Sequence, residues 1–149
     1  MKKQTKITIV IMTLLVIAMI PIFIQTNKKT ETTQTTINIP VTELSTNAKF
    51  FEEDIDGVKL QFFAVKDEEG NIKTAMNACD VCYNSKKGYT QDGEYMICNN
   101  CGNRYHISGL GTENKRGGGC WPSYLDSEVI DDELVIQTQN LAKAKYQFR

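Results

Sequence analysis

Four cysteines stand in two pairs of Cys-x-x-Cys spacing, Cys79 with Cys82 and Cys98 with Cys101. Two thiolates three residues apart on a tight turn can bind one metal ion, because the turn directs both sulfurs to the same side. The 15 residues between the pairs fall in the range typical of four-thiolate metal sites. The spacing therefore predicts a metal centre, zinc or iron-sulfur, on these four cysteines.

Disulfide bonds are the alternative use of the same cysteines. A bridge within one Cys-x-x-Cys unit closes too small a loop to stabilise much, and such pairs are usually redox-active. Disulfide bonds between the two units would close larger loops and stabilise the fold more. The chain has five cysteines, so any disulfide scheme leaves one thiol over, and this favours metal.

The fifth cysteine, Cys120, follows three glycines and precedes Trp121 and Pro122. Glycines allow a backbone to approach a cluster closely and to direct N–H groups at its sulfurs. We therefore count Cys120 among the candidate cofactor-binding residues, either as a ligand or as a neighbouring thiol. The alternative is a flexible loop with a thiol that takes no part.

His106 is the only histidine, and its place between Tyr105 and Ile107 is typical of a histidine on a strand rather than of a ligand. Several tyrosines crowd the cysteine region, and we expect them to pack in the core and around its rim. The acidic run Phe50 to Asp56 is typical of a solvated surface.

Strands must position these side chains, because no stretch after residue 36 has a convincing helical period. Val58 to Lys66 alternates as a strand does, Asp67 to Asn71 is a turn, and Ile72 to Ala78 is a second strand that leads to Cys79. Further strands are expected near Pro40, at the edge of a sheet, and at three later segments. These are Glu94 to Ile97, Arg104 to Ile107, and a closing hairpin from Val129 to Ile136 around Asp131 and Asp132. The sequence predicts a small all-β antiparallel domain.

The N-terminal quarter has a different composition. Residues 7–24 form an uncharged run of 18, which at about 1.5 Å per residue can just span a bilayer core of about 30 Å. No small-residue cleavage site follows, which favours an uncleaved anchor over a secretory signal. The prediction is a cytoplasmic segment 1–6, an anchor 7–24, a Thr-rich linker 25–36, an extracytoplasmic domain 37–140 and a C-terminal tail 141–149.

The charge balance excludes one class of partner. Of the 17 basic side chains, Lys2, Lys3 and Lys6 precede the apolar segment, which leaves 14 against 18 acidic ones. Nucleic-acid binders need a basic surface to neutralise phosphates. We therefore expect no nucleic-acid partner.

The stretch from Ile39 to Ile136 resembles the FtrD-like family of membrane iron-sulfur proteins. The likeness runs through Phe62–Lys66, Thr74–Tyr83, Lys86–Tyr89, Met96–Gly102, Gly111–Glu113 and Gly118–Cys120. The resemblance implies an iron-sulfur or related metal centre in a membrane-associated protein that is linked to ferrous-iron permeases. The sequence departs from the family pattern at Asn77, where aspartate is more common, and at Trp121, where asparagine is.

A more distant similarity is to Rieske domains, in which Cys-x-His and Cys-x-x-His pairs hold a two-iron cluster. The shared order is a strand with the first pair, a second pair followed by glycine, an aromatic strand, a glycine loop with proline and a final hairpin. Here cysteine would replace each histidine. The similarity implies a small Rieske-like fold, and fold alone does not give function.

Three functions fit these residues. The first is an electron-transfer or metal-handling subunit beside an iron permease or another redox partner. The second is a binding module in which zinc only stabilises the loops and the surface recruits a partner protein at the membrane. The third is a thiol-disulfide oxidoreductase, the one enzyme among them, which needs an exposed Cys-x-x-Cys of low pKa at the start of a helix. Neither pair precedes a helical pattern, so the first function is preferred.

Overall fold

The structure is a computed structural model that describes residues 35–149. The predicted cytoplasmic segment, the anchor 7–24 and all but the last two residues of the linker lie outside the described residues. Within residues 35–149, every helix is too short or too polar to cross a bilayer.

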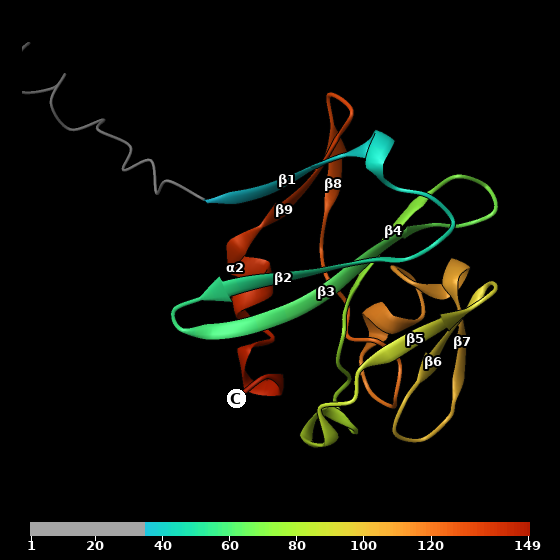
Figure 1. Cartoon of the computed structure of the whole chain (residues 1–149), viewed down its shortest axis with the longest axis vertical. Coiled ribbons are helices and arrows are strands. Elements are labelled where there is room, and N and C mark those ends of the chain that lie inside the picture. The colour runs from blue at the N-terminus through green and yellow to red at the C-terminus, as the bar shows by residue number, and fades with distance from the viewer. Residues whose placement is uncertain (1–34) are drawn as a thin grey trace, which may run out of the picture. The chain divides into compact units, whose positions relative to one another are not determined.

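Residues 35–149 form three antiparallel sheets of three strands each, which confirms the all-β prediction (Figure 1). The first sheet has the order β1-β9-β8, the second β2-β3-β4 and the third β5-β6-β7. The strands are β1 (Thr36–Pro40), β2 (Lys49–Ile55), β3 (Val58–Lys66), β4 (Ile72–Met76), β5 (Tyr89–Asp92), β6 (Tyr95–Cys98), β7 (Arg104–His106), β8 (Glu128–Ile130) and β9 (Glu133–Gln137).

The helical segments of the described chain are short. Five are single 3₁₀ turns and one is an α-helix of five residues. They are η2 (Val41–Glu43), η3 (Tyr83–Ser85), η4 (Ile107–Gly109), η5 (Asn114–Arg116), α2 (Thr138–Ala142) and η6 (Lys145–Gln147).

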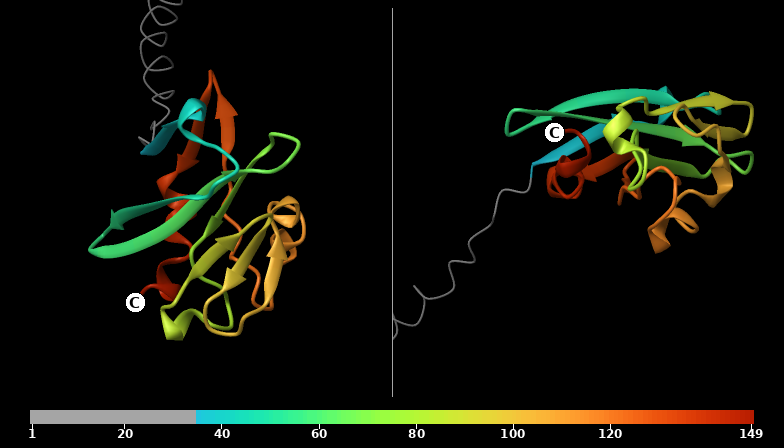
Figure 2. Two further views of the ribbon diagram at one scale, coloured as in Figure 1. Left: turned by 45° about the vertical axis from the view of Figure 1, so that its right-hand side comes forward. Right: turned by 90° about the horizontal axis from the view of Figure 1, so that it is seen from below.

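The second half of strand β3, Phe62–Val65, is buried on both faces and so joins two cores. Leu60, Phe62 and Ala64 pack in one core with residues of β1, β9 and α2, whereas Phe63 and Val65 pack in the other with residues of β5 and β6. Successive side chains of a strand point to opposite faces, and a strand covered on both faces is apolar along its length. This explains the run Phe62–Val65. Figure 2 shows the sheet of β5, β6 and β7 set off to one side of the other two.

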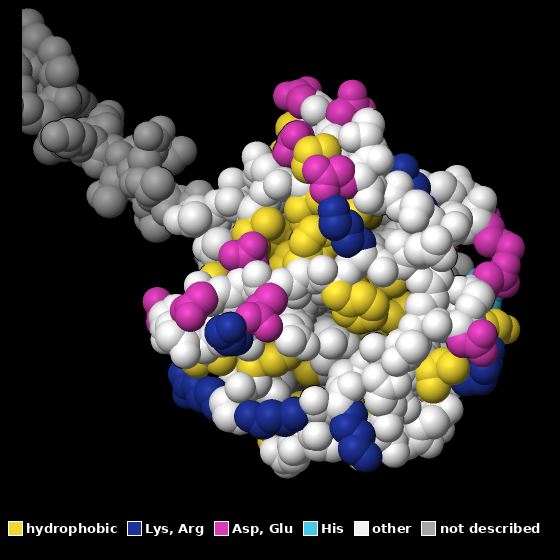
Figure 3. Space-filling view, in the orientation of Figure 1, with side chains coloured by type: hydrophobic (Ala, Val, Ile, Leu, Met, Phe, Trp, Pro, Cys, Tyr) yellow, Lys and Arg dark blue, Asp and Glu magenta, His cyan; other side chains and the backbone are white. Residues whose placement is uncertain are grey.

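The hairpins follow from local turn chemistry. Asp56 and Gly57 both have positive φ between β2 and β3, as do Asp131 and Asp132 between β8 and β9. Two central residues of positive φ suit the right-handed twist of a hairpin. The closing hairpin and the β3–β4 hairpin were both predicted. In Figure 3, acidic side chains gather at the ends of the β8–β9 and β2–β3 hairpins.

Two strands were not predicted. β2 covers most of the acidic run that was interpreted only as a solvated surface, and its Glu52 accepts a hydrogen bond from Lys59 of β3 at 2.8 Å. β5 is only four residues long. The C-terminal residues pack against the first core, where Leu141 and Ala144 are buried and Phe148 lies against the cluster.

Candidate metal centre

All five cysteines lie at one end of the β5-β6-β7 sheet, four of them in loops and Cys98 as the last residue of β6. Cys79 and Cys82 follow β4, Cys98 ends β6 and Cys101 lies in the turn to β7. Cys120 comes from the loop between η5 and β8, 38 residues after Cys82. The structure therefore brings together every cysteine that the sequence singled out, and all five are free thiols.

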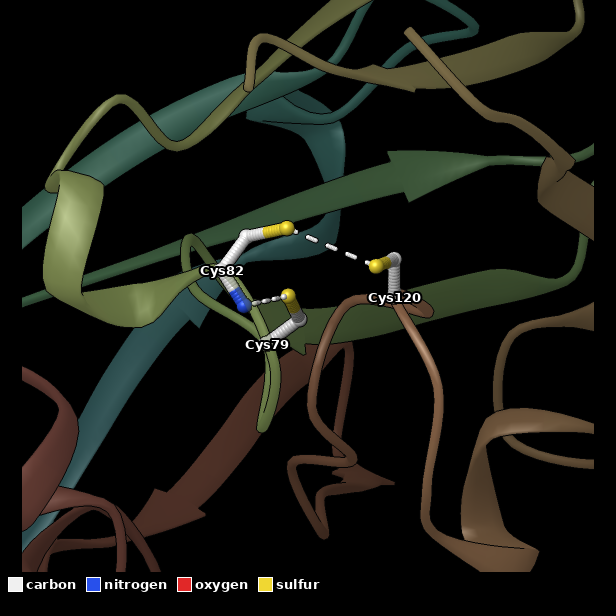
Figure 4. A group of neighbouring side chains, drawn as sticks. All are labelled: Cys79, Cys82 and Cys120. Atoms are coloured by element: carbon white, nitrogen blue, oxygen red, sulfur yellow. Dashed lines mark hydrogen bonds between the residues drawn. The ribbon is translucent and has the colours of Figure 1, made fainter. Parts of the chain in front are cut away.

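The sulfurs form two groups of three. Those of Cys79, Cys82 and Cys120 lie within 4.8 Å of one another, and so do those of Cys82, Cys98 and Cys101. The Cys82 and Cys120 sulfurs are 3.4 Å apart. Figure 4 shows Cys120 directed at the Cys79–Cys82 turn from a separate loop. Cys82 is thus the member common to both groups.

Each Cys-x-x-Cys turn is closed by its own backbone. In the first, the Cys82 N–H donates to the Cys79 sulfur at 3.1 Å. In the second, the Gly102 N–H donates to the Cys98 carbonyl at 2.8 Å, and Gly102 has a φ of 75° that favours glycine. The Cys82 N–H stabilises negative charge on the Cys79 sulfur, whereas the Gly102 N–H only closes the second turn.

The loop that carries Cys120 is held in place on both sides. The Tyr89 hydroxyl donates to the Cys120 carbonyl at 2.5 Å. Trp121 packs on Tyr105 with ring centroids 4.7 Å apart. The buried Asn114 donates to the Pro122 carbonyl at 2.9 Å and accepts from the Gly111 N–H at 2.7 Å. These contacts oppose the interpretation of this segment as a flexible loop.

The three glycines before Cys120 allow an unusual backbone conformation, and they are not required by close packing against neighbouring atoms. Gly117, Gly118 and Gly119 have φ of 71°, 85° and 71°, and an added Cβ on any of them would meet nothing within 4 Å. Their conformation, which side chains disfavour, turns the chain so that Cys120 faces the Cys79–Cys82 turn.

Three asparagines that position the loops were missed as functional residues. Asn77 accepts from the Tyr89 N–H at 2.8 Å and lies so close to Gly88 that a side chain there would clash. Asn99 bridges Thr90 and Lys87. Asn114 holds the glycine loop, as described above. Only one feature of the sequence indicated these roles, namely that polar residues stand beside each cysteine segment.

Burial divides the cysteines. Cys79 and Cys98 are each 1% exposed in the second core, Cys82 and Cys120 are half-buried, and Cys101 is exposed. A hollow of about 190 Å³ lies against Cys79, Cys82 and Cys98, and Lys59 and Lys86 also line it. The centre thus has a buried side and a side open to solvent.

The thiols also differ electrostatically. A hydrogen bond from Asn100, together with contacts to Cys120, Cys98 and Cys79, lowers the pKa of Cys82 to about 7. Burial raises the pKa of Cys98 to about 11 and raises that of Cys120 further. Buried thiols of high pKa ionise when a cation is present to stabilise the thiolates. Five converging sulfurs suit zinc, copper(I) or an iron-sulfur cluster, since these prefer thiolate ligands.

The remaining sequence candidates lie elsewhere or play structural roles. His106 ends β7, contacts Glu94 at 3.3 Å and Ser108 at 2.7 Å, and belongs to neither sulfur group. Tyr89 is buried and Tyr105 is half-buried beside the cysteines. Burial raises the pKa of Tyr105 to about 12, so its hydroxyl stays protonated.

A comparison with protein families identifies a family for this chain. The family model described as membrane iron-sulfur containing protein FtrD-like matches residues 44–148, which include all five cysteines. No curated protein gives a significant match.

Proposed function

The chain belongs to the FtrD-like family of membrane iron-sulfur containing proteins, and we propose that Cys79, Cys82, Cys98 and Cys101 hold an iron-sulfur centre for electron transfer or metal handling. The observation that carries the proposal is that the sulfurs of Cys82, Cys98 and Cys101, which come from two separate loops, lie within 4.8 Å of one another, and that the Cys79 sulfur lies within 4.8 Å of that of Cys82. Iron-sulfur clusters are held by cysteine thiolates, which is the donor set present here.

The side chains around the cysteines would tune such a centre. Hydrogen bonds to ligand sulfurs and solvent exposure both shift the reduction potential of iron-sulfur clusters. The Cys79 sulfur accepts the Cys82 N–H, and Asn100 makes a hydrogen bond with the Cys82 sulfur. The exposed Cys101 offers the edge at which a redox partner can approach, whereas Cys79 and Cys98 are shielded.

The proposed setting is the outer side of the cell membrane. Residues 7–24 would anchor the chain in a single pass, and the linker would hold the domain of residues 37–140 on the extracytoplasmic side. An iron permease or a redox partner beside it would exchange electrons or metal with the centre. A Rieske-like arrangement belongs to the same proposal, supported by the cysteine pairs that follow β4 and β6 and by the closing β8–β9 hairpin.

A zinc-stabilised binding module is the second candidate. Val81, in the turn of the first cysteine pair, is 61% exposed, and Tyr146 is 52% exposed. Apolar side chains of this kind next to a structural metal site would suit recruitment of a partner protein.

Metal and sulfide analysis separates these functions. The full-length chain is purified in detergent without oxygen, and its visible spectrum, iron, zinc and acid-labile sulfide are measured. Iron with sulfide and sulfur-to-iron absorption are expected. Zinc without sulfide would favour the binding module, and a chain without metal would overturn both functions.

A matched pair of serine variants tests the site. Cys98→Ser should lose the metal and much of the stability, because structural thiolate sites contribute roughly 10 to 16 kcal/mol of apparent binding free energy. Asn84→Ser, at an exposed position just after the first pair, should retain both. An unchanged metal ratio in Cys98→Ser would contradict the proposed ligand set.

A further inference from the structure

The segment that follows α2, residues 145–149, lies against the loop of the first cysteine pair. Its η6 turn brings Tyr146 and Gln147 to Asp80, the residue that follows Cys79. The Tyr146 hydroxyl donates to Asp80 Oδ1 at 2.7 Å, and Gln147 Nε2 donates to the same oxygen at 2.8 Å. Two donors from one segment therefore hold the side chain of a residue inside the first Cys-x-x-Cys turn.

Gln147 connects the loop of the first cysteine pair with the loop that carries Cys120. It is 2% exposed, and its Nε2 lies 2.8 Å from Asp80 Oδ1 and 2.7 Å from the Ser123 hydroxyl. Ser123 comes three residues after Cys120, and its N–H donates to the Ala78 carbonyl at 2.8 Å. One buried amide thus holds the two loops together.

Further contacts hold the same segment on the η3 turn. Lys86 Nζ donates to the Arg149 carbonyl at 2.6 Å and lies 3.4 Å from the Phe148 carbonyl oxygen. The rings of Tyr83 and Tyr146 meet edge to face, with centroids 5.7 Å apart. Figure 2 shows the C-terminal end beside the loop that follows β4 in both views. Because Phe148 also packs against the first core, the segment joins that core to the cysteine loop.

Asp80 also places a negative charge next to a proposed ligand. Net charge and hydrogen bonding around an iron-sulfur cluster shift its reduction potential, and added negative charge favours the oxidised state. The donors of Tyr146 and Gln147 offset part of the Asp80 charge, because their hydrogens carry partial positive charge. Loss of either donor therefore makes the electrostatic potential at the cysteines more negative.

We propose that Tyr146 and Gln147 are positioning residues of the metal centre: through Asp80 they hold the first Cys-x-x-Cys turn and offset its negative charge. Partners that orient the ligands of a metal tune its affinity and its potential although they do not bind it themselves. The inference rests on the proposed function in taking the cysteines as the ligands of a metal centre. It brings residues 145–149, interpreted from the sequence as part of a tail, into the construction of the site.

Reduction potentials test the effect of the charge. The full-length chain in detergent, with its cluster, is titrated with a reductant without oxygen. Asp80→Asn should raise the potential, because a negative charge is removed, whereas Tyr146→Phe should lower it, because the ring remains and the donor is lost. Tyr83→Phe is the matched control and should leave the potential unchanged, since its hydroxyl is not among the donors to Asp80.

A double variant shows whether the effect of Tyr146 passes through Asp80. In the Asp80→Asn background, Tyr146→Phe should shift the potential much less than it does in the parent chain. Equal shifts in the two backgrounds, shifts of the same sign for both single variants, or no shift at all would overturn the inference.

Thiol labelling of the reduced, metal-free chain tests the positioning without a cofactor. Cys79 and Cys98 are both 1% exposed, but only Cys79 lies in the turn that Asp80 belongs to. Gln147→Ala should therefore raise the rate of iodoacetamide labelling at Cys79 several-fold relative to that at Cys98, as read by mass spectrometry. A general loss of stability would raise both rates together and overturn the inference. Gln137→Ala, at the end of β9, should leave the ratio unchanged.

Metal and sulfide analysis of the parent chain separates this inference from the proposed function. Zinc without sulfide would overturn the iron-sulfur proposal, and a higher labelling ratio in Gln147→Ala would still support the positioning role. An intact cluster together with an unchanged labelling ratio and unchanged potentials in the variants would overturn the positioning role and leave the iron-sulfur proposal standing.

Discussion

Asp67 illustrates how a single buried carboxylate can organise a turn. It is 8% exposed and accepts hydrogen bonds from the Glu69 N–H at 3.1 Å, the Asn71 N–H at 2.8 Å and the Asn71 side-chain amide at 3.1 Å. The Lys73 ammonium lies 3.6 Å away. Burial raises the pKa of Asp67, but the hydrogen bonds from Asn71 and the charge of Lys73 outweigh it and hold the pKa below its usual value.

Asp67→Asn should lower the free energy of unfolding by about 1 to 3 kcal/mol at neutral pH, because charged hydrogen bonds are lost and two amide groups then face each other. A carboxylate of depressed pKa stabilises the fold above its unfolded pKa of about 4 and loses that contribution as the pH falls through its folded pKa. The variant should therefore depend less on pH in this acid range. Urea unfolding at several pH values measures this, and Asp92→Asn, in an exposed pair with Arg104, should change little.

Tyr89 links the second core to the metal loop through one hydroxyl. Tyr89→Phe keeps the buried ring and removes the donor to the Cys120 carbonyl, which should cost about 0.5 to 1.5 kcal/mol. Because the glycine loop loses this tether, metal should pass to a chelator roughly 10-fold faster at unchanged stoichiometry. The more exposed Tyr95→Phe provides the control. Equal chelator rates in both variants would show that the tether does not hold the loop.

At the scale of single residues, the sequence predicted the cysteine ligands but not the side chains that hold their loops in place. The types and spacing of Cys79, Cys82, Cys98 and Cys101 predict a thiolate centre because both members of each pair lie on one turn. The roles of Asn77 and Asn114 depend on Tyr89 and Pro122, which lie beyond the reach of local turn patterns. Such contacts become visible only when the loops are in place.

The turn of the β8–β9 hairpin is a place where a substitution can raise the stability of the fold. Asp131 and Asp132 have φ of 49° and 63°, a conformation that glycine adopts without steric cost. Asp132→Gly should raise the free energy of unfolding by up to about 1 kcal/mol. Glu133→Gly, one residue later in β9, should instead lower it by about 0.5 to 1 kcal/mol. Urea unfolding of both variants, with the metal content held equal, distinguishes a turn effect from a general effect of glycine.

Strands with a clear apolar pattern and a recognisable turn beside them were predicted from the sequence, and strands without these features were missed. β3 was predicted at its observed bounds because an apolar strand is followed by the turn Asp67–Asn71. β2 was missed because three acidic residues interrupt its apolar pattern. Glu52 and Asp54 pair with the exposed Gln61 and Lys59 of β3, whereas the half-buried Glu53 lies opposite Leu60. β5 was missed because it has four residues and relies on β6 for its place.

On the scale of the whole domain, the arrangement depends on contacts between distant segments. β1 pairs with β9 across nearly 100 residues, and Cys120 reaches the first cysteine pair from 38 residues away. These long-range contacts form because both faces of β3 carry apolar side chains, and other segments must pack on each face to bury them. Composition and periodicity predict that some segments pack on each face of β3, but they do not predict which segments these are. The position of Cys120 was accordingly left open by the sequence.

Residues 7–24 are expected to hold the chain at the membrane. Residues 7–24 are uncharged, long enough to cross a bilayer core, and not followed by a small-residue cleavage site. Lys2, Lys3 and Lys6 precede them, which favours an N-terminus inside. The mature protein should therefore retain these residues and stay in the membrane fraction after a high-salt wash.

Protease added to intact cells should remove the domain from Asn27 onward, because the linker 25–36 has no apolar residue to bury before Ile37. Leu15→Arg should weaken insertion, since arginine at the centre of a span costs about 3 kcal/mol, whereas Leu15→Ile should not. A soluble protein with a new N-terminus near Gln25 would instead identify the segment as a signal peptide. The metal centre would then act free of the membrane, and an adjoining permease would have to bind the domain through its surface alone.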